Sequence, residues 1–250
     1  MSRWVLEGLR TGIKSTHYPN APEGAAGISP GRPASRVIAA QAQSPCPTDA
    51  LGAANGMSIV DYRKCVHCQR CKDVEPAIVD WQQDYEWAAK GDAPGIAGEL
   101  NRQFQRSLHI RFVDAGACGA CMSEARQLNN PYYNMHRLGF FFTPTPRNAD
   151  VLMVTGPVTQ AMWWPLLDTY AAIPPPKRVL AVGVCAISGG VFGRNPAVAG
   201  GAAEAIPIDV AVPGCPPPPL AILHGLLVLV RRKPPHPLTS GRQPTLEPAT

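Results

Sequence analysis

The 250-residue sequence predicts an α/β fold in which a parallel sheet is covered by helices on both faces. Four short runs in its second half are almost wholly apolar, as expected of strands that are buried on both sides. A segment with helical spacing lies between the second and third runs, and a longer apolar segment follows the fourth. Apolar strands that alternate with helices indicate a doubly wound sheet.

The elements of this sheet can be placed in order along the chain. We expect strands at 110–113, 151–155, 179–184 and 208–212, and helices at 161–171 and 220–230. Gly156-Pro157 ends the second strand and Pro213-Gly214 ends the fourth, because such dipeptides interrupt regular structure. The apolar run at 220–230 is shorter than the roughly 20 residues that cross a membrane, so we expect no transmembrane segment.

Composition divides the chain into five parts. Residues 1–30 are rich in Gly, Pro and Ala, and we expect an extended arm. Residues 31–87 hold the first four cysteines, and 88–104 form a polar, glycine-containing linker. Residues 105–230 form the sheet domain. Residues 231–250 are rich in Pro with almost no apolar side chains, and we expect a tail that is either disordered or draped over a partner.

Charge and cysteine content limit the partners and the compartment. The 23 basic and 18 acidic residues give a net charge of +5, and no Lys/Arg run is dense enough to indicate nucleic-acid binding. No secretory signal is recognisable at the N-terminus, which predicts a cytoplasmic protein with reduced thiols. The eight cysteines are therefore expected to bind metal instead of forming disulfides.

The first four cysteines have the spacing of an iron–sulfur site. Cys65, Cys68 and Cys71 form a C-x2-C-x2-C run, which can hold three corners of a cubane cluster. Cys46, followed by Pro47, can supply the fourth corner, as a Cys-Pro does in two-cluster bacterial ferredoxins. Zinc is the alternative, although zinc ribbons usually pair two separate knuckles. The pattern favours a 4Fe–4S cluster.

The other four cysteines follow predicted strands. Cys118 and Cys121 come after the first strand, Cys185 after the third and Cys215 after the fourth. The carboxyl ends of parallel strands share one edge of the sheet, where ligands bind. Four thiolates suit either zinc or an iron–sulfur cluster, and the spacing leaves both open.

The region from Cys118 to about Val230 resembles the small iron–sulfur subunit shared by complex I and membrane-bound, energy-converting NiFe hydrogenases, including formate hydrogenlyase. The matching runs are NPYY at 130–133, RLGF at 137–140, TPRNADVL at 145–152, TGPVT at 155–159, GVCAISGGVF at 183–192 and VPGCPP at 212–217. The resemblance implies a flavodoxin-like fold and a 4Fe–4S cluster beside a large catalytic subunit. Its ligands would be Cys118, Cys121, Cys185 and Cys215.

The N-terminal half resembles the ferredoxin-like subunit of the same complexes, on GIKSTHYP at 12–19, on Cys46-Pro47-Thr48 and on the Cys65–Cys71 run. We therefore interpret the chain as a ferredoxin-like module fused to the small subunit, with two 4Fe–4S clusters. Two residues separate Cys118 from Cys121, as in the hydrogenase branch, whereas complex I subunits have adjacent cysteines. Met122 stands where hydrogenase relatives carry Glu.

The resemblance implies an oxidoreductase subunit that relays electrons through two 4Fe–4S clusters to or from the large subunit. The complex would also contain membrane subunits, with this chain peripheral on the cytoplasmic face. The alternatives are the equivalent subunit of a complex I-like quinone oxidoreductase and a zinc-binding module without redox activity. No residue of this chain is expected to be catalytic. Arg137 and Arg147 are expected near a cluster or a partner, with an ordinary surface position as the alternative. Trp163 and Trp164 are expected in the core or an interface.

Overall fold

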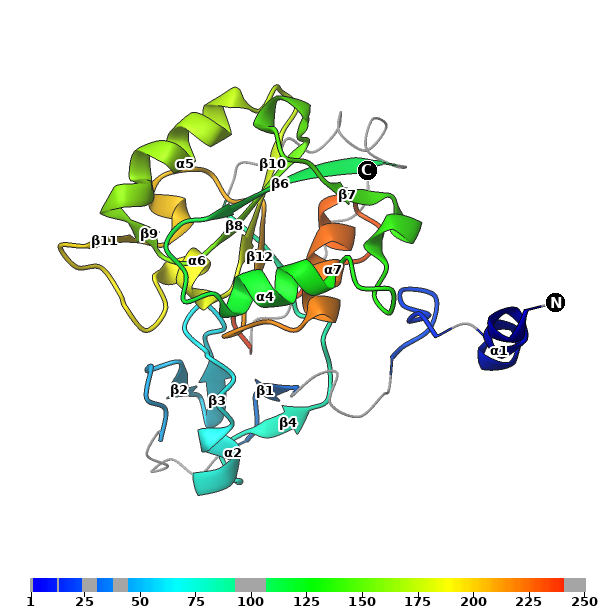
Figure 1. The fold of residues 1–250 in the computed structure, drawn as a ribbon. Helices are drawn as coiled ribbons and strands as arrows, with labels where there is room; N and C mark the ends of the chain where they lie inside the picture. Colours follow the sequence, from blue (N-terminus) through cyan, green and yellow to red (C-terminus); the bar gives the residue numbers. More distant parts are fainter. Residues whose placement is uncertain (1, 13, 24–30, 38–44, 93–106, 241–250) are drawn as a thin grey trace, which may run out of the picture.

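A six-stranded sheet forms the centre of the molecule in the computed structural model, which describes residues 2–12, 14–23, 31–37, 45–92 and 107–240 (Figure 1). The strand order is β5-β12-β10-β8-β6-β7. The strands are β5 (Ala89–Lys90), β6 (Leu108–Asp114), β7 (Phe140–Phe142), β8 (Val151–Thr155), β10 (Arg178–Val182) and β12 (Val210–Val212). Strands β6, β7, β8, β10 and β12 pair in parallel, and β5 pairs antiparallel with β12.

The topology is that of flavodoxin. Counted along the chain from β6, the five parallel strands lie in the order 2-1-3-4-5. The predicted doubly wound α/β fold is therefore confirmed. Strands β5 and β7 were not predicted, because two or three residues are too few for a pattern to be recognised.

Helices cover both faces of this sheet. Helices α4 (Ala120–Gln127) and α7 (Pro219–Leu229) pack on one face, and α5 (Gln160–Ala172) packs on the other. In β8, Met153 contributes to the first core and Leu152 and Val154 to the second, since successive side chains point to opposite faces. Helix α7 is apolar on all sides and buried along nearly its whole length. In the described ranges, no helix has the length and apolar character needed to cross a membrane.

The remaining elements are short. A small module contains β1 (Arg32–Ala34), β2 (Leu51–Ala54), β3 (Met57–Val60), α2 (Arg70–Val74) and β4 (Asp80–Gln82). The sheet domain also contains η1 (Met135–Leu138), η2 (Pro146–Asn148), β9 (Val158–Thr159), α6 (Val184–Ser188), β11 (Val198–Gly200) and η3 (Ala202–Glu204). The small module lies next to the sheet edge from which α4 and α6 start (Figure 1).

Two antiparallel pairs build the small module. Strand β1 pairs with β4, and β2 forms a hairpin with β3. Asn55 and Gly56 at the hairpin turn both have positive φ, which a tight hairpin turn requires. The module has a small core around Leu51, Val60 and Tyr62, so its attachment to the sheet domain contributes to its stability.

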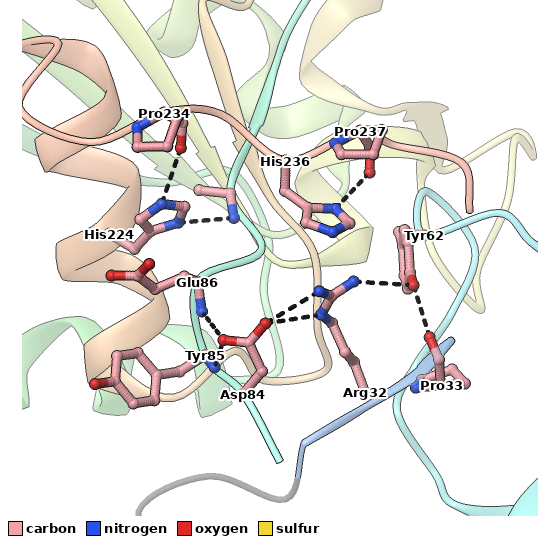
Figure 2. Close-up of polar contacts among 11 residues, drawn as sticks. Arg32, Pro33, Tyr62, Asp84, Tyr85, Glu86, His224, Pro234, His236 and Pro237 are labelled. Atoms are coloured by element: carbon pink, nitrogen blue, oxygen red, sulfur yellow. Dashed lines mark hydrogen bonds and ion pairs between the residues drawn. The ribbon is translucent and has the colours of Figure 1, made fainter. Parts of the chain in front are cut away.

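An ion pair between the buried Arg32 and the partly exposed Asp84 fixes the module to the segment that enters the sheet (Figure 2). The Arg32 guanidinium lies 3.0 Å from an Asp84 carboxylate oxygen and donates a 3.1 Å hydrogen bond to the Tyr62 hydroxyl. The other Asp84 oxygen accepts hydrogen bonds from the amides of Tyr85 and Glu86. Burial alone would raise the pKa of Asp84, but these amides and Arg32 hold it below its ordinary value. The carboxylate is therefore charged and fully engaged.

Residues 231–240, here called the strap, correct the prediction of a disordered tail. The Ser240 hydroxyl accepts a 2.7 Å hydrogen bond from the Val60 amide, and the Leu238 carbonyl accepts one from the Tyr62 amide. The His236 amide donates to the Ala88 carbonyl beside β5. The strap is held by backbone hydrogen bonds, which side-chain composition does not reveal. Residues 241–250 lie outside the described part.

Three other predictions are corrected at the N-terminal side. Within the arm, Arg3–Thr11 forms helix α1, and Tyr18 is buried with its ring 5.2 Å from that of Tyr85. The Arg137 guanidinium donates a hydrogen bond to the Tyr18 carbonyl, so Arg137 holds the arm. The predicted linker begins with β5 of the sheet, and its residues 93–104 are outside the described ranges.

The buried His224 connects α7 to both the strap and the chain before β5 (Figure 2). Its Nδ1 accepts a 3.1 Å hydrogen bond from the Ala88 amide, so its Nε2–H faces the Pro234 carbonyl at 3.2 Å. This arrangement requires a neutral imidazole. Burial lowers the pKa of His224 more than the nearby Glu86 carboxylate raises it.

Replacing Asp84 by Asn should lower the free energy of unfolding by about 1–3 kcal/mol, because Arg32 would keep a buried charge without its counterion. Asp80→Asn is the matched control. Asp80 pairs with Arg36 at 3.4 Å on the exposed surface, where such pairs contribute at most about 1 kcal/mol. Urea unfolding of both variants measures the difference. Equal losses would contradict the assigned importance of the Arg32–Asp84 pair.

Stability should also fall as the pH drops below about 6.5, the pKa of histidine in the unfolded chain. Because the folded pKa of His224 is lowered, the unfolded state binds more protons in this range, and the stability is complete only at higher pH. His224→Gln can keep both hydrogen bonds without titrating. The slope of unfolding free energy against pH should be smaller in this variant, and an unchanged slope would refute the assignment.

Candidate functional site

Four cysteines meet at the carboxyl edge of the parallel strands. Cys118 lies in the loop after β6, Cys121 in α4, Cys185 in α6 directly after β10, and Cys215 after β12. A hydrogen bond between the thiols of Cys185 and Cys215 raises the pKa of Cys185 and lowers that of Cys215. Burial, followed by the charges of Cys215 and Cys118, raises the pKa of Cys121 to about 12. The fold thus brings together the four residues that the sequence predicted, here called the sheet quartet.

Glycines make room for these thiols. A Cβ at Gly183 would lie 2.6 Å from the sulfur of Cys121, and one at Gly190 would lie 2.7 Å from that of Cys185. Both glycines have positive φ, a conformation that other residues rarely adopt. The backbone therefore approaches the sulfurs more closely than any side chain would allow.

The other four cysteines surround one cavity in the small module. Cys46, Cys65, Cys68 and Cys71, here called the module quartet, line it together with apolar side chains that include Val66 and Trp81. Burial, opposed by a hydrogen bond from the His67 amide, raises the pKa of Cys65 to about 12. The neighbouring thiols of Cys46, Cys71 and Cys68 raise this pKa further, which shows that the four lie close together.

Backbone amides point at the sulfurs of the module quartet. The Ala50 amide donates to the sulfur of Cys46 at 3.3 Å, and the amides of His67 and Lys72 donate to Cys65 and Cys71. His67 and Gln69 have positive φ, so the Cys65–Cys71 loop is tightly turned. Hydrogen bonds to sulfur are a feature of protein-bound iron–sulfur clusters and contribute to setting their potentials.

The donor chemistry of both quartets fits an iron–sulfur cluster. All eight cysteines are described, and none of them forms a disulfide bond with another. Among described residues, no group of three or more His, Cys, Asp or Glu side chains is arranged to hold a metal ion. A four-iron cluster needs a different geometry from a single metal ion. Each cysteine binds a different iron atom, so the four sulfurs surround the cofactor and do not converge on one point. Thiols whose pKa is raised by burial and by one another also need nearby cations to ionise, and the iron of a bound cluster would supply them.

Trp87 lies between the two quartets and was not predicted as a site residue. Its ring packs edge-on against the imidazole of His67, with centroids 4.9 Å apart. Its indole N–H donates a 2.8 Å hydrogen bond to the carbonyl of Pro213, two residues before Cys215. His67 is buried, with only 9% of its surface exposed. No local pattern around Trp87 signals this position, because its partners are distant in sequence.

A second contact also crosses between the quartets. The Ser188 hydroxyl, three residues after Cys185, donates a 2.6 Å hydrogen bond to the carbonyl of Arg63, two residues before Cys65. Both contacts join loops that carry cysteines, so the separation of the quartets is set directly by the chain around them.

The predicted aromatic residues of α5 differ in their surroundings. Trp163 packs partly against the second core, whereas Trp164 is 69% exposed. Arg147 is exposed as well. Val191 and Phe192, in the loop after Cys185, are also exposed. The exposed apolar side chains of Trp164, Val191 and Phe192 are suited to contact with another protein.

Comparison with known proteins identifies the sheet domain. Residues 118–229 match the family described as NADH ubiquinone oxidoreductase, 20 Kd subunit. The match begins at the first cysteine of the sheet quartet, so the module quartet lies outside it.

Three named relatives support the same family assignment. The chain is 40% identical over 130 residues to formate hydrogenlyase subunit 7 of Escherichia coli (strain K12), covering 52% of this chain and 51% of that protein. It is 39% identical over 134 residues to the probable membrane-bound hydrogenase subunit mbhJ of Pyrococcus furiosus, covering 54% and 80%. It is 44% identical over 97 residues to an NADH-quinone oxidoreductase subunit of Rhizobium etli, covering 39% and 58%.

The match thus spans about half the length of formate hydrogenlyase subunit 7 but four fifths of the hydrogenase subunit from Pyrococcus furiosus. The relatives are subunits of oxidoreductases. With its flavodoxin-like sheet and the cysteines at its carboxyl edge, this chain belongs to the family of the 20 kDa subunit of NADH ubiquinone oxidoreductase.

Proposed function

We propose that this chain is the electron-transfer subunit of a membrane-associated, energy-converting hydrogenase-like complex of the formate hydrogenlyase type. The observation that carries the proposal is the gathering of eight cysteines into two separate groups of four. Similarity to two hydrogenase-complex subunits supports the choice of complex.

Each quartet would hold one 4Fe–4S cluster, the sheet quartet through Cys118, Cys121, Cys185 and Cys215 and the module quartet through Cys46, Cys65, Cys68 and Cys71. Bound clusters of this type accept and release electrons one at a time. The chain itself binds the iron through thiolates, donates amide hydrogen bonds to sulfur and excludes water with apolar walls. No side chain of this protein is required to transfer a proton or to attack a substrate.

The burial of the thiols suggests where partners approach. Cys65 and Cys121 are buried, whereas Cys68, Cys118 and Cys215 are exposed. Each quartet therefore has a protected side and an open side. We propose that the large catalytic subunit covers the open side of the sheet quartet and the exposed Trp164 and Phe192. Membrane subunits of the complex would keep the chain on the cytoplasmic face of the membrane.

A specific groove favours a second candidate, the equivalent subunit of a complex I-like quinone oxidoreductase. Arg111, Phe112, Met122 and Phe142 line a groove beside α4, the helix that carries Cys121. Its aromatic walls and a cationic side chain suit a quinone head group. Assays of the purified complex distinguish the two: hydrogen evolution supports the first candidate, and reduction of a soluble quinone without hydrogen evolution supports the second.

Anaerobically purified protein should contain about eight iron and about eight sulfide per chain, with an EPR signal after reduction. Cys185→Ser and Cys68→Ser should each reduce the iron content to about half, because they affect different quartets. Stoichiometric zinc without iron would eliminate the electron-transfer proposal in favour of a zinc-binding module.

Replacing Gly183 by Ala should remove the iron of the sheet quartet and spare that of the module quartet, because the new methyl group would collide with the sulfur of Cys121. Gly193→Ala is the control, since Gly193 has positive φ but open space around its Cβ position. Both variants carry backbone strain of about 1 kcal/mol or more, and only the first carries the collision. Equal iron content in the two variants would show that this close approach is not needed.

A further inference from the structure

The module quartet and the sheet quartet are joined through one buried aromatic side chain. We propose that Trp87, in contact with His67, is the residue that electronically couples the two quartets. This inference rests on the proposed function, since it requires a cluster at each quartet. It assigns a role to two residues that are not ligands themselves.

The contacts of Trp87 form a short route. His67 lies between Cys65 and Cys68, and its imidazole ring packs on the indole of Trp87 with an interplanar angle of 70°. The opposite end of the route is the hydrogen bond from the indole N–H to the carbonyl of Pro213. From that carbonyl, the chain reaches Cys215 through Gly214 alone. Delocalised π electrons mix with a transferring electron more readily than saturated side chains do.

The surroundings of Trp87 keep it in place. The side chain is 1% exposed, so water does not separate the two rings. The next residue, Ala88, is held by hydrogen bonds to His224 and His236, and β5 begins directly after it. On the other side, Asp84 ties the chain to Arg32. The indole is thus fixed from both directions along the backbone.

The packing against Trp87 holds the imidazole ring of His67 in place. Its Nε2 is buried and has no hydrogen-bond partner in the described residues. An imidazole that is buried without a partner for this nitrogen needs a compensating contact, and the ring of Trp87 provides one.

The step that Trp87 assists is a single electron transfer. The reduced cluster at one quartet would lose one electron, and the oxidised cluster at the other quartet would gain it. No proton moves, and no bond forms or breaks. Trp87 is neither oxidised nor reduced, because it contributes only electronic coupling. The first electron comes from an external one-electron reductant, which in the experiment is a photoexcited deazaflavin.

The experiment follows electron redistribution between the two sites after a flash, by optical absorption, in protein with its full iron content. Trp87→Leu removes the ring, and Trp87→Phe keeps a ring but removes the indole N–H. Trp4→Leu removes an exposed tryptophan in helix α1, and Ser188→Ala removes the other contact between the quartets. We expect redistribution to slow several-fold in Trp87→Leu and less in Trp87→Phe, and to be unchanged in Trp4→Leu and Ser188→Ala.

Wild-type rates in both Trp87 variants would overturn the inference. If Trp87→Leu does not fold, the comparison of Trp87→Phe with Ser188→Ala decides: slowing confined to Trp87→Phe supports the inference, and equal rates in these two variants refute it. Reduction potentials of both sites, measured by EPR-monitored titration, separate a loss of coupling from a change in driving force. A wild-type protein without iron would instead refute the proposed function.

Discussion

Four thiols packed against one another in a protein cannot all ionise unless a cation lies among them. Burial raises the pKa of Cys65 and of Cys121 to about 12, and the neighbouring thiols add to this effect. Ionising closely packed, buried thiols is unfavourable, and the chain contains two such groups. Iron in a cubane cluster would provide the positive charge that both quartets need, and the amides and glycines around the sulfurs fit that cofactor. The rest of the structure serves to keep each quartet closed.

Two different mechanisms close the quartets. In the sheet domain, parallel strands end at one edge and bring together loops that are up to about a hundred residues apart in sequence. In the small module, a tight loop supplies three cysteines, and a distant Cys46 completes the set. The module core is small, so the ion pair of Arg32, the strap and Trp87 stabilise its position on the sheet domain. These contacts also fix the separation of the two quartets, as the proposed electron transfer between them would require.

Much of this arrangement could be predicted from the sequence. Continuous apolar runs identified β6, β8, β10 and β12, because strands buried on both faces leave a strong pattern. The proximity of the four cysteines that follow these strands could then be predicted, because the carboxyl ends of parallel strands lie at one edge of the sheet. The order of the strands followed only from the resemblance, because local patterns carry no information about which strands are neighbours.

Other features could not be predicted, for identifiable physical reasons. The strap was mistaken for a disordered tail because it is held by hydrogen bonds from the amides of Tyr62 and Val60 to the Leu238 carbonyl and the Ser240 hydroxyl, and not by apolar side chains. Strand β5, with two residues, is too short to show a pattern of alternating apolar and polar side chains. Trp87 and His67 are separated in the chain by helix α2 and strand β4, so neither residue's surroundings in sequence suggest the contact.

The central claim is that this one chain encloses two separate iron–sulfur clusters at a fixed separation. Anomalous X-ray diffraction at the iron absorption edge, on crystals grown anaerobically, tests it most directly. The account predicts two distinct iron peaks, one inside each quartet, with the density of Trp87 between them. A single iron peak, or a quartet whose cysteines point away from one another, would contradict it.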